Sequence, residues 1–324
     1  MGKANLAVNR LLERKEIFAD LINGTIFEGK PVLQAAELEM ISPHSGIMKK
    51  KEKGKAGAIE REGDIRMKAG IGTCIVWFAN ETQNKVHYAM PVRTMLYDAL
   101  EYTKQIQDLE KQHKEDGSVL ETAELLSGLT KEDRLEPVIT TVLYLGESWD
   151  GAMSLYDLLK IDLEDPVYEE LKEYLPNYRI NLLCAADMPH TERFCTCLQH
   201  IFNMLKYKEE KELLKEYIEK HRTDLDKMDS VEMMAALVML GEQKRVEQLL
   251  EGKNEEEEEI TVCKAIEEMI QDGIEQGIEQ GMEQGERRFA ALMDRLLEEH
   301  REDLIPQVIK DAILRKEMYQ QYKI

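Results

Sequence analysis

The sequence has no long apolar run and no apolar segment near its N-terminus. No stretch of its 324 residues approaches the ~20 consecutive apolar residues that a membrane-spanning helix needs. Charged residues are scattered through the opening segment MGKANLAVNRLLERKEIF, which excludes the apolar region of a secretion signal. We therefore expect a cytoplasmic protein that has no membrane partner.

Cysteine is scarce and irregularly placed. The five cysteines are an odd number spread over a long chain, which is not the pattern of a disulfide framework. One short segment nevertheless gathers potential zinc ligands: Cys184, His190, Cys195, Cys197 and His200. Their spacing fits no pair of CxxC motifs, so we interpret them as small core thiols and surface histidines, with a zinc site as the alternative.

Several well-known catalytic patterns are also missing. The sequence contains no Walker loop, no GxGxxG segment and no Ser–His–Asp order. It therefore gives no support to an ATPase, a dinucleotide-binding enzyme or a serine hydrolase.

The distribution of charge matters more than its total. A net charge of −21 argues against a nucleic-acid partner, because phosphate repels acid. Residues 1–100, however, hold 15 basic and 12 acidic side chains, a balance of +3, whereas residues 101–200 hold 9 and 21, a balance of −12. The N-terminal region includes a basic run interrupted by glycine: Lys49, Lys50, Lys51, Lys53 and Lys55. Such a loop is suited to contact a DNA backbone without reading its sequence, although a solvated loop has the same composition.

Apolar periodicity predicts strands and helices in alternation over roughly the first 200 residues. The expected strands are Cys74–Ala79, Pro137–Leu145 and Asn177–Ala186, which are rich in β-branched and apolar residues. The expected helices are Asn5–Leu21, which Asn23-Gly24 ends, Val92–Leu109 after Met90-Pro91, and Thr191–Tyr207. The fold class is therefore α/β, followed by an all-α extension.

The C-terminal region has an unusual repeat. A run of glutamates, Glu255–Glu259, precedes a tandem G-[IM]-E-Q repeat with an apolar residue at every fourth position. Each glycine costs up to ~1 kcal/mol in an isolated helix, so a helix here needs a packing partner. The simplest partner is the same segment of a second chain, which predicts a homo-oligomer; a flexible linker is the alternative. We thus divide the chain into a domain at 1–207, a helical extension at 208–250 and an acidic helical tail at 251–324.

Two acidic residues and an amide form a candidate metal site. Asp64 leads into a β-prone segment, and Glu81 and Gln83 follow the Cys74–Ala79 run. Residues i and i+2 of a strand share a face, so Glu81 and Gln83 should project together. If Asp64 lies on a neighbouring strand, two carboxylates meet, and Mg²⁺ binds one or two carboxylates together with water and phosphate oxygens. Arg93, or a lysine of the basic run, would hold the phosphate.

Four segments carry a resemblance to a known family. ETQNKVHYAMPVRTMLYDALEYTKQ, EREGDIRMK, PVITTVLYLGESWDG and the GIEQ repeats resemble the family of Rpn-type recombination-promoting nucleases and putative transposases, over about residues 10 to 290. That family is similar to the PD-(D/E)xK phosphodiesterases.

The resemblance implies a restriction-endonuclease-like mixed sheet flanked by helices. It also implies Mg²⁺, with Mn²⁺ as a substitute, held by Asp64 and Glu81, with Glu13 or Glu16 as an additional ligand. Gln83 falls where the superfamily has lysine, and an amide can bind water but cannot offset negative charge.

The function expected from the residues and the resemblance together is a Mg²⁺-dependent DNA endonuclease of low sequence specificity. The resemblance links it to recombination, mobile elements or defence in a bacterial cytosol. The alternative is a non-catalytic DNA- or protein-binding oligomer on a nuclease fold that has lost its activity.

Overall fold

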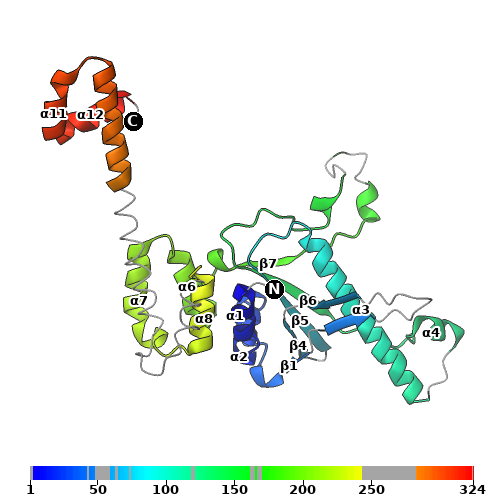
Figure 1. The fold of residues 1–324 in the computed structure, drawn as a ribbon. Coiled ribbons are helices and arrows are strands. Elements are labelled where there is room, and N and C mark those ends of the chain that lie inside the picture. The colour runs from blue at the N-terminus through cyan, green and yellow to red at the C-terminus, as the bar shows by residue number, and fades with distance from the viewer. Residues whose placement is uncertain are drawn as a thin grey trace. The chain divides into compact units, whose positions relative to one another are not determined.

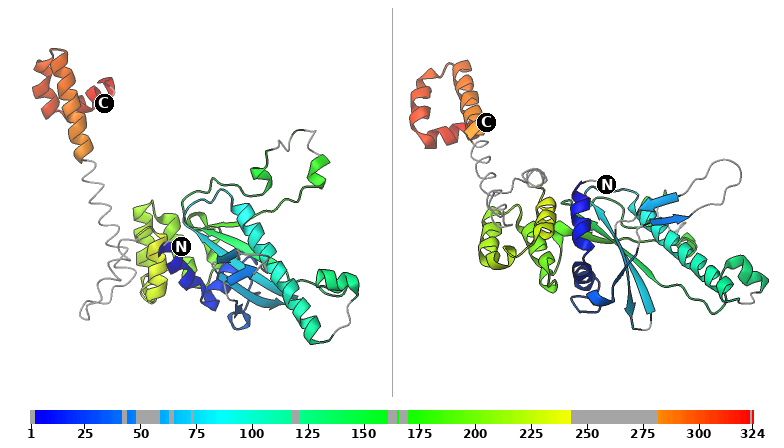
Figure 2. Two further views of the ribbon diagram at one scale, coloured as in Figure 1. Left: turned by 45° about the vertical axis from the view of Figure 1, so that its right-hand side comes forward. Right: turned by 60° about the horizontal axis from the view of Figure 1, so that its bottom comes forward.

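The chain divides into two units, Met1–Val262 and Cys263–Ile324. The computed structural model (Figures 1 and 2) describes residues 3–41, 44–47, 59–62, 65–72, 74–117, 121–160, 165, 170–242, 282–322 and 324. The basic run, Asp64 and all of the glycine repeat before Met282 lie outside these residues. Each unit is described by itself.

A five-stranded mixed sheet forms the centre of the first unit, in the order β1-β4-β5-β6-β7. Its strands are β1 (Glu39–Met40), β4 (Ile65–Ile71), β5 (Cys74–Gln83), β6 (Val138–Tyr144) and β7 (Asn181–Cys184). β1, β4 and β5 are antiparallel, whereas β6 and β7 run parallel to β5. A separate antiparallel pair joins β2 (His44–Ile47) to β3 (Ile59–Glu62). The predicted α/β class is confirmed.

β5 is longer than its apolar run predicted. It continues through four polar residues to Gln83, because β4 and β6 flank it on both sides and satisfy its backbone. Asn80 and Thr82 are fully buried on one face, where Thr82 Oγ1 donates to Asn9 Oδ1 at 2.7 Å and Thr141 Oγ1 donates to Asn80 Oδ1 at 3.1 Å. Hydrogen bonding inside the protein thus compensates for the polar burial that shortened the prediction.

One long helix, α3 (Met90–Glu115), forms the crossover from β5 to the parallel strand β6. It begins with Pro91 in its first turn, where a missing N–H costs nothing. It extends beyond the predicted Val92–Leu109 at both ends, and its buried face carries two acids and one amide as well as apolar residues. A short helix, α4 (Thr122–Ser127), follows it and ends at Gly128, whose φ of 74° favours glycine. Figure 1 shows α3 on one side of the sheet and the N-terminal helices on the other.

The predicted single helix over Asn5–Leu21 is wrong. The structure has two helices, α1 (Lys3–Leu12) and α2 (Lys15–Thr25), separated at Arg14, whose backbone is extended. Tertiary packing causes the break: α1 packs against β5 and α8, whereas α2 packs against α6. At the junction Arg14 forms an ion pair of 2.6 Å with Asp229.

The expected helix end at Asn23-Gly24 is also wrong, since α2 continues to Thr25 and buries both residues. The Asn23 amide instead donates to the Leu33 carbonyl and accepts from the Leu33 N–H, both at 2.9 Å, and so holds the following loop. A Cβ on Gly24 would lie 2.3 Å from the Phe194 ring. Glycine is therefore present for close helix packing and not for a cap.

Three helices follow in the described part of the first unit: α6 (Cys197–Tyr207), α7 (Lys211–Leu225) and α8 (Ser230–Met239). α7 packs on α6, and α8 packs on both α6 and α1. The predicted boundary after residue 207 falls between α6 and α7, two helices in contact. Short 3-10 turns connect the elements: η1 (Ala35–Glu37), η2 (Tyr156–Leu158), η3 (Glu170–Glu173), η4 (Ala185–Asp187) and η5 (Thr191–Arg193).

The second unit has a small core of its own. Residues 282–298 are helical and are followed by η6 (Glu302–Leu304), α11 (Ile305–Lys310) and α12 (Ala312–Tyr322). Leu292, Leu296, Val308 and Met318 are buried together. Among the helices that the structure describes in the two units, none is both long and apolar enough to cross a bilayer. The predicted association of chains through the tail stays a prediction.

Candidate functional site

The site centres on Glu81, near the carboxyl end of β5. Its side chain is only 2% exposed and accepts an ion-paired hydrogen bond from Arg93 Nη2 at 3.1 Å. Arg93 comes from the first turns of α3 and also lies 5.4 Å from the centre of the Tyr97 ring. The structure thus brings together two of the residues that the sequence singled out, a carboxylate and the arginine expected to hold phosphate.

Gln83 is the last residue of β5 and is half-buried. By the alternation of a strand it shares the face of Glu81. Its backbone carbonyl accepts from the Leu145 N–H at 2.8 Å, so the strand is still paired with the segment after β6 at this position. The predicted grouping of Glu81 and Gln83 on one face fits this register.

Asp64 lies outside the described residues, but its neighbour in the chain does not. Ile65 begins β4 and pairs with Asn80, the residue before Glu81. The described end of β4 therefore leads to the end of the sheet where Glu81 lies. The lysines of the basic run also lie outside the described residues, so their DNA contact stays a prediction.

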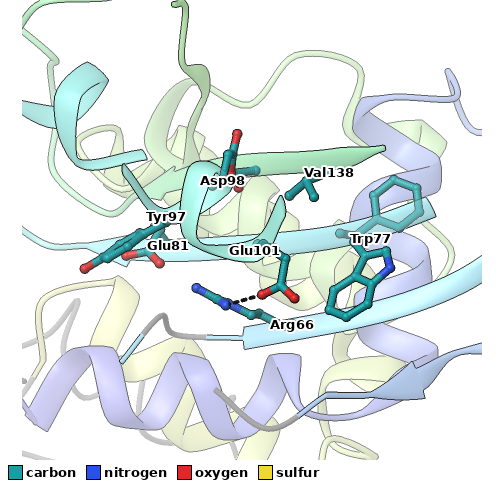
Figure 3. A pocket seen from close by; sticks show the side chains of 10 residues that line it. Arg66, Trp77, Glu81, Tyr97, Asp98, Glu101 and Val138 are labelled. Carbon is teal, nitrogen blue, oxygen red and sulfur yellow. Dashed lines mark hydrogen bonds and ion pairs between the residues drawn. The ribbon is translucent and has the colours of Figure 1, made fainter. Parts of the chain in front are cut away.

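Between α3 and the sheet lies a second, more deeply buried ion pair. Arg66 of β4 and Glu101 of α3 approach to 2.6 Å, and their side chains are 5% and 3% exposed. In Figure 3 this pair lies beside Glu81 and Tyr97, on the α3 face of the sheet. Burial of two charges is compensated only when they meet, as these two side chains do between β4 and α3.

Asp98 of α3 belongs to a third buried polar contact. It accepts hydrogen bonds of 2.5 Å from Thr140 of β6 and from the Tyr178 hydroxyl. Burial raises the pKa of the Asp98 carboxyl, while these two hydrogen bonds and the charge of Arg66 act in the opposite direction. Burial and the adjacent Asp98 raise the pKa of Tyr178, whose hydroxyl therefore stays a donor.

A small cavity and a larger cleft lie near these groups. A cavity of about 10 Å³, the room for about one water, lies among Arg66, Trp77, Glu81, Asp98 and Glu101. A cleft of about 560 Å³ opens at the carboxyl ends of β5 and β6. Two cations, Lys85 and Lys208, line that cleft together with Tyr144 and Glu147. The cleft is therefore far larger than the space beside Glu81.

The two alternatives for an additional carboxylate, Glu13 and Glu16, are both exposed. Glu16 lies in the first turn of α2, and Glu13 lies between α1 and α2. α1 contacts the face of β5 that carries Thr82, opposite the face from which Glu81 projects. The choice between the two acids stays open.

The five potential zinc ligands of the segment 184–200 do not lie around one point. Asp20 of α2 accepts from the Cys195 backbone N–H at 3.0 Å and from its thiol at 3.2 Å, and Cys197 is buried. Burial raises the pKa of both thiols. His190 pairs with Glu192 at 3.1 Å, whereas His200 meets side chains of α7.

Sequence reasoning missed Arg66, Glu101, Thr140 and Tyr178, and the two cleft lysines. A signal for the first pair exists in the helix pattern. Tyr97, Glu101 and Gln105 follow one another at a spacing of four on the face that also carries the apolar Met90 and Leu100. A charged residue on the apolar face of a long helix indicates a buried partner. That this partner is Arg66 depends on strand pairing, which the sequence of the helix does not predict.

Comparison of the chain with protein-family models, with curated proteins and with solved structures finds no match. Function is therefore inferred from the chemistry of the site.

Proposed function

We propose that this chain is a Mg²⁺-dependent DNA endonuclease of low sequence specificity, with Glu81 and Asp64 as the metal ligands. One observation carries the proposal: β5, which holds Glu81, pairs with β4, and Ile65 at the start of β4 pairs with Asn80, the residue before Glu81. The resemblance of the surrounding segments to Rpn-type nucleases supports the same assignment.

The residues present fit a magnesium site in their chemistry. Mg²⁺ takes carboxylate and water oxygens and needs only one or two carboxylates from the protein. The Glu81 carboxylate supplies one such ligand once Arg93, its present ion-pair partner, turns away. A bound Mg²⁺ would lower the pKa of a coordinated water and offset the charge that develops on the phosphate.

Arg93 and Gln83 have separate roles in this proposal. Arg93 is 24% exposed and holds Glu81 in place, and its guanidinium can turn from the carboxylate to a phosphate oxygen when a metal ion takes over the charge of Glu81. The amide of Gln83 orients the attacking water on the same face, because it offers both a donor and an acceptor. Lys85 and Lys208, which line the neighbouring cleft, contact the DNA backbone.

A plasmid-nicking assay tests the proposal. The full-length protein should convert supercoiled plasmid to nicked circles with Mg²⁺ or Mn²⁺ and not with EDTA. The Asp64→Asn variant should lose this activity while retaining the circular dichroism of the wild type. Nicking that persists in EDTA, or an Asp64→Asn variant that nicks at the wild-type rate, would contradict the assignment.

Gln83 offers a test with a gain of function. Gln83→Lys should retain or raise the nicking rate, because the added charge lies beside the scissile phosphate. Gln83→Leu should lower the rate by about 10- to 100-fold, the usual range for an outer contact of a metal site. The rates are compared under single-turnover conditions at equal protein concentration. A fast Leu variant and a dead Lys variant would show that Gln83 does not face the metal.

One observation favours the second candidate, a non-catalytic DNA- or protein-binding oligomer. Glu81 is nearly inaccessible and its charge is balanced by Arg93, so a chain without metal is already satisfied at this position. In that case Glu81→Gln would alter stability alone, and DNA binding measured by fluorescence anisotropy would not depend on Mg²⁺. The nicking assay separates the two functions.

A further inference from the structure

Two histidines and an aspartate lie together where α6 packs on α7. His200 comes from α6, and His221 and Asp224 come from α7. One potential ligand atom from each lies within 4.8 Å of the other two. His221 and Asp224 are three residues apart, so they share one face of α7. The two imidazoles are half-buried and the carboxylate is exposed, which leaves the group open to solvent on one side.

The neighbouring Tyr217 holds one of the imidazoles. The His200 Nδ1 atom lies 2.9 Å from the Tyr217 hydroxyl, which leaves Nε2 as the ring nitrogen available to a ligand. The same tyrosine ring packs against His221, with 4.4 Å between ring centroids. Burial lowers the pKa of His200, and the neighbouring His221 adds to this effect. Burial raises the pKa of Tyr217 to about 12, so its hydroxyl stays neutral.

We propose that His200, His221 and Asp224 bind one divalent transition-metal ion, in the first instance Zn²⁺, which joins α6 to α7. Imidazole nitrogen is a preferred ligand of Zn²⁺ and a poor one for Mg²⁺ or Ca²⁺. Two nitrogens and one carboxylate oxygen complete three of the four positions of a tetrahedral ion and leave the fourth to water or another small ligand. The hydrogen bond between His200 and Tyr217 is the kind of outer contact that orients a metal-binding imidazole.

The geometry needs only a small adjustment. Ligand atoms of a tetrahedral Zn²⁺ lie roughly 3.4 Å apart, given Zn–N and Zn–O bonds of about 2.1 Å. The present separations of up to 4.8 Å shorten to that value by side-chain rotation. Asp224 also pairs with Lys227 at 3.0 Å, but both side chains are more than half exposed, and an ion pair of this kind offers little resistance.

The other explanation of the cluster is ring packing without a metal. Stacking among Tyr207, Tyr217, His200 and His221 accounts for the imidazoles. It leaves the Asp224 carboxylate with its exposed Lys227 ion pair alone and gives no reason for its place within 4.8 Å of both imidazoles. The two explanations therefore differ in what they predict for Asp224.

Metal binding to the full-length chain decides between them. Protein freed of metal by EDTA and dialysis is titrated with Zn²⁺ by calorimetry, and with Co²⁺ as a spectroscopic probe. We expect one Zn²⁺ per chain at this site and visible Co²⁺ d–d bands without the near-ultraviolet band of a thiolate ligand. His221→Gln and Asp224→Asn should each weaken the affinity more than about 100-fold, beyond the range seen when outer contacts of a metal site are removed.

Two matched variants define the site. His190→Gln removes an exposed histidine that is paired with Glu192 outside the cluster and should bind Zn²⁺ as the wild type does. Glu81→Gln should also bind Zn²⁺ unchanged, which separates this site from the proposed magnesium site. Because Asp224 is exposed, Asp224→Asn leaves the core intact and remains a fair test even if His221→Gln fails to fold. A wild-type chain that binds no Zn²⁺, or an Asp224→Asn variant with wild-type affinity, would overturn the proposal.

Discussion

Glu81→Gln should lower Mg²⁺-dependent plasmid nicking by more than about 100-fold, because it removes a carboxylate ligand while keeping the size of the side chain. Glutamine cannot carry the negative charge that holds a cation next to Asp64. The substitution also leaves the Arg93 guanidinium, now 3.1 Å from the carboxylate, without its counter-charge. The rate is measured at saturating Mg²⁺ and again with Mn²⁺, which distinguishes weakened metal binding from lost catalysis.

The control for this variant is Glu39→Gln. Glu39 lies on the edge strand β1, is 69% exposed and pairs with Lys68 at 3.2 Å. Its replacement removes the same charge from the same sheet and should leave nicking within about twofold of the wild type, as expected for an exposed surface pair. If both variants nick alike, the carboxylate of Glu81 has no part in the reaction, and the binding function described above becomes the better account.

Arg66→Met should lower the free energy of unfolding by about 3–5 kcal/mol, because Glu101 would then be a buried carboxylate without its cation. The two side chains are 5% and 3% exposed and meet at 2.6 Å between β4 and α3. Glu101→Leu should lower the free energy of unfolding by a similar amount, because Arg66 would then be a buried cation without its carboxylate. Chemical denaturation followed by circular dichroism measures the change. The fluorescence of Trp77, which lines the same small cavity, reports on this region.

The double variant Arg66→Met/Glu101→Leu should recover most of that loss, since two apolar side chains of similar volume need no charge compensation. Lys68→Met is the matched control. Lys68 lies two residues along β4 on the same face, but its partner Glu39 is exposed, so the cost should stay below about 1 kcal/mol. Equal losses for Arg66→Met and Lys68→Met would mean that the buried pair does not hold α3 on the sheet.

The predicted bounds of some elements match the structure more closely than those of others, for a physical reason. The run at 137–145 was confirmed as β6 almost to the residue, because its β-branched and apolar residues form one segment that Gly146 ends. β5 was predicted four residues too short, since its polar end is stabilised by neighbours that lie far away in the sequence. The break between α1 and α2 was missed for the same reason: the helical periodicity continues through it.

By itself, the sequence determined the α/β class, the place of the long helix after β5, and the pairing of Glu81 and Gln83 on one strand face. These three features follow from the spacing of apolar and polar residues along the sequence. The tertiary structure alone decided that Arg93 turns to Glu81, that Arg66 meets Glu101, and that His200 joins His221 and Asp224 instead of the cysteines beside it. Each of these contacts joins two different elements, and periodicity shows which face a residue occupies but not which face packs against it.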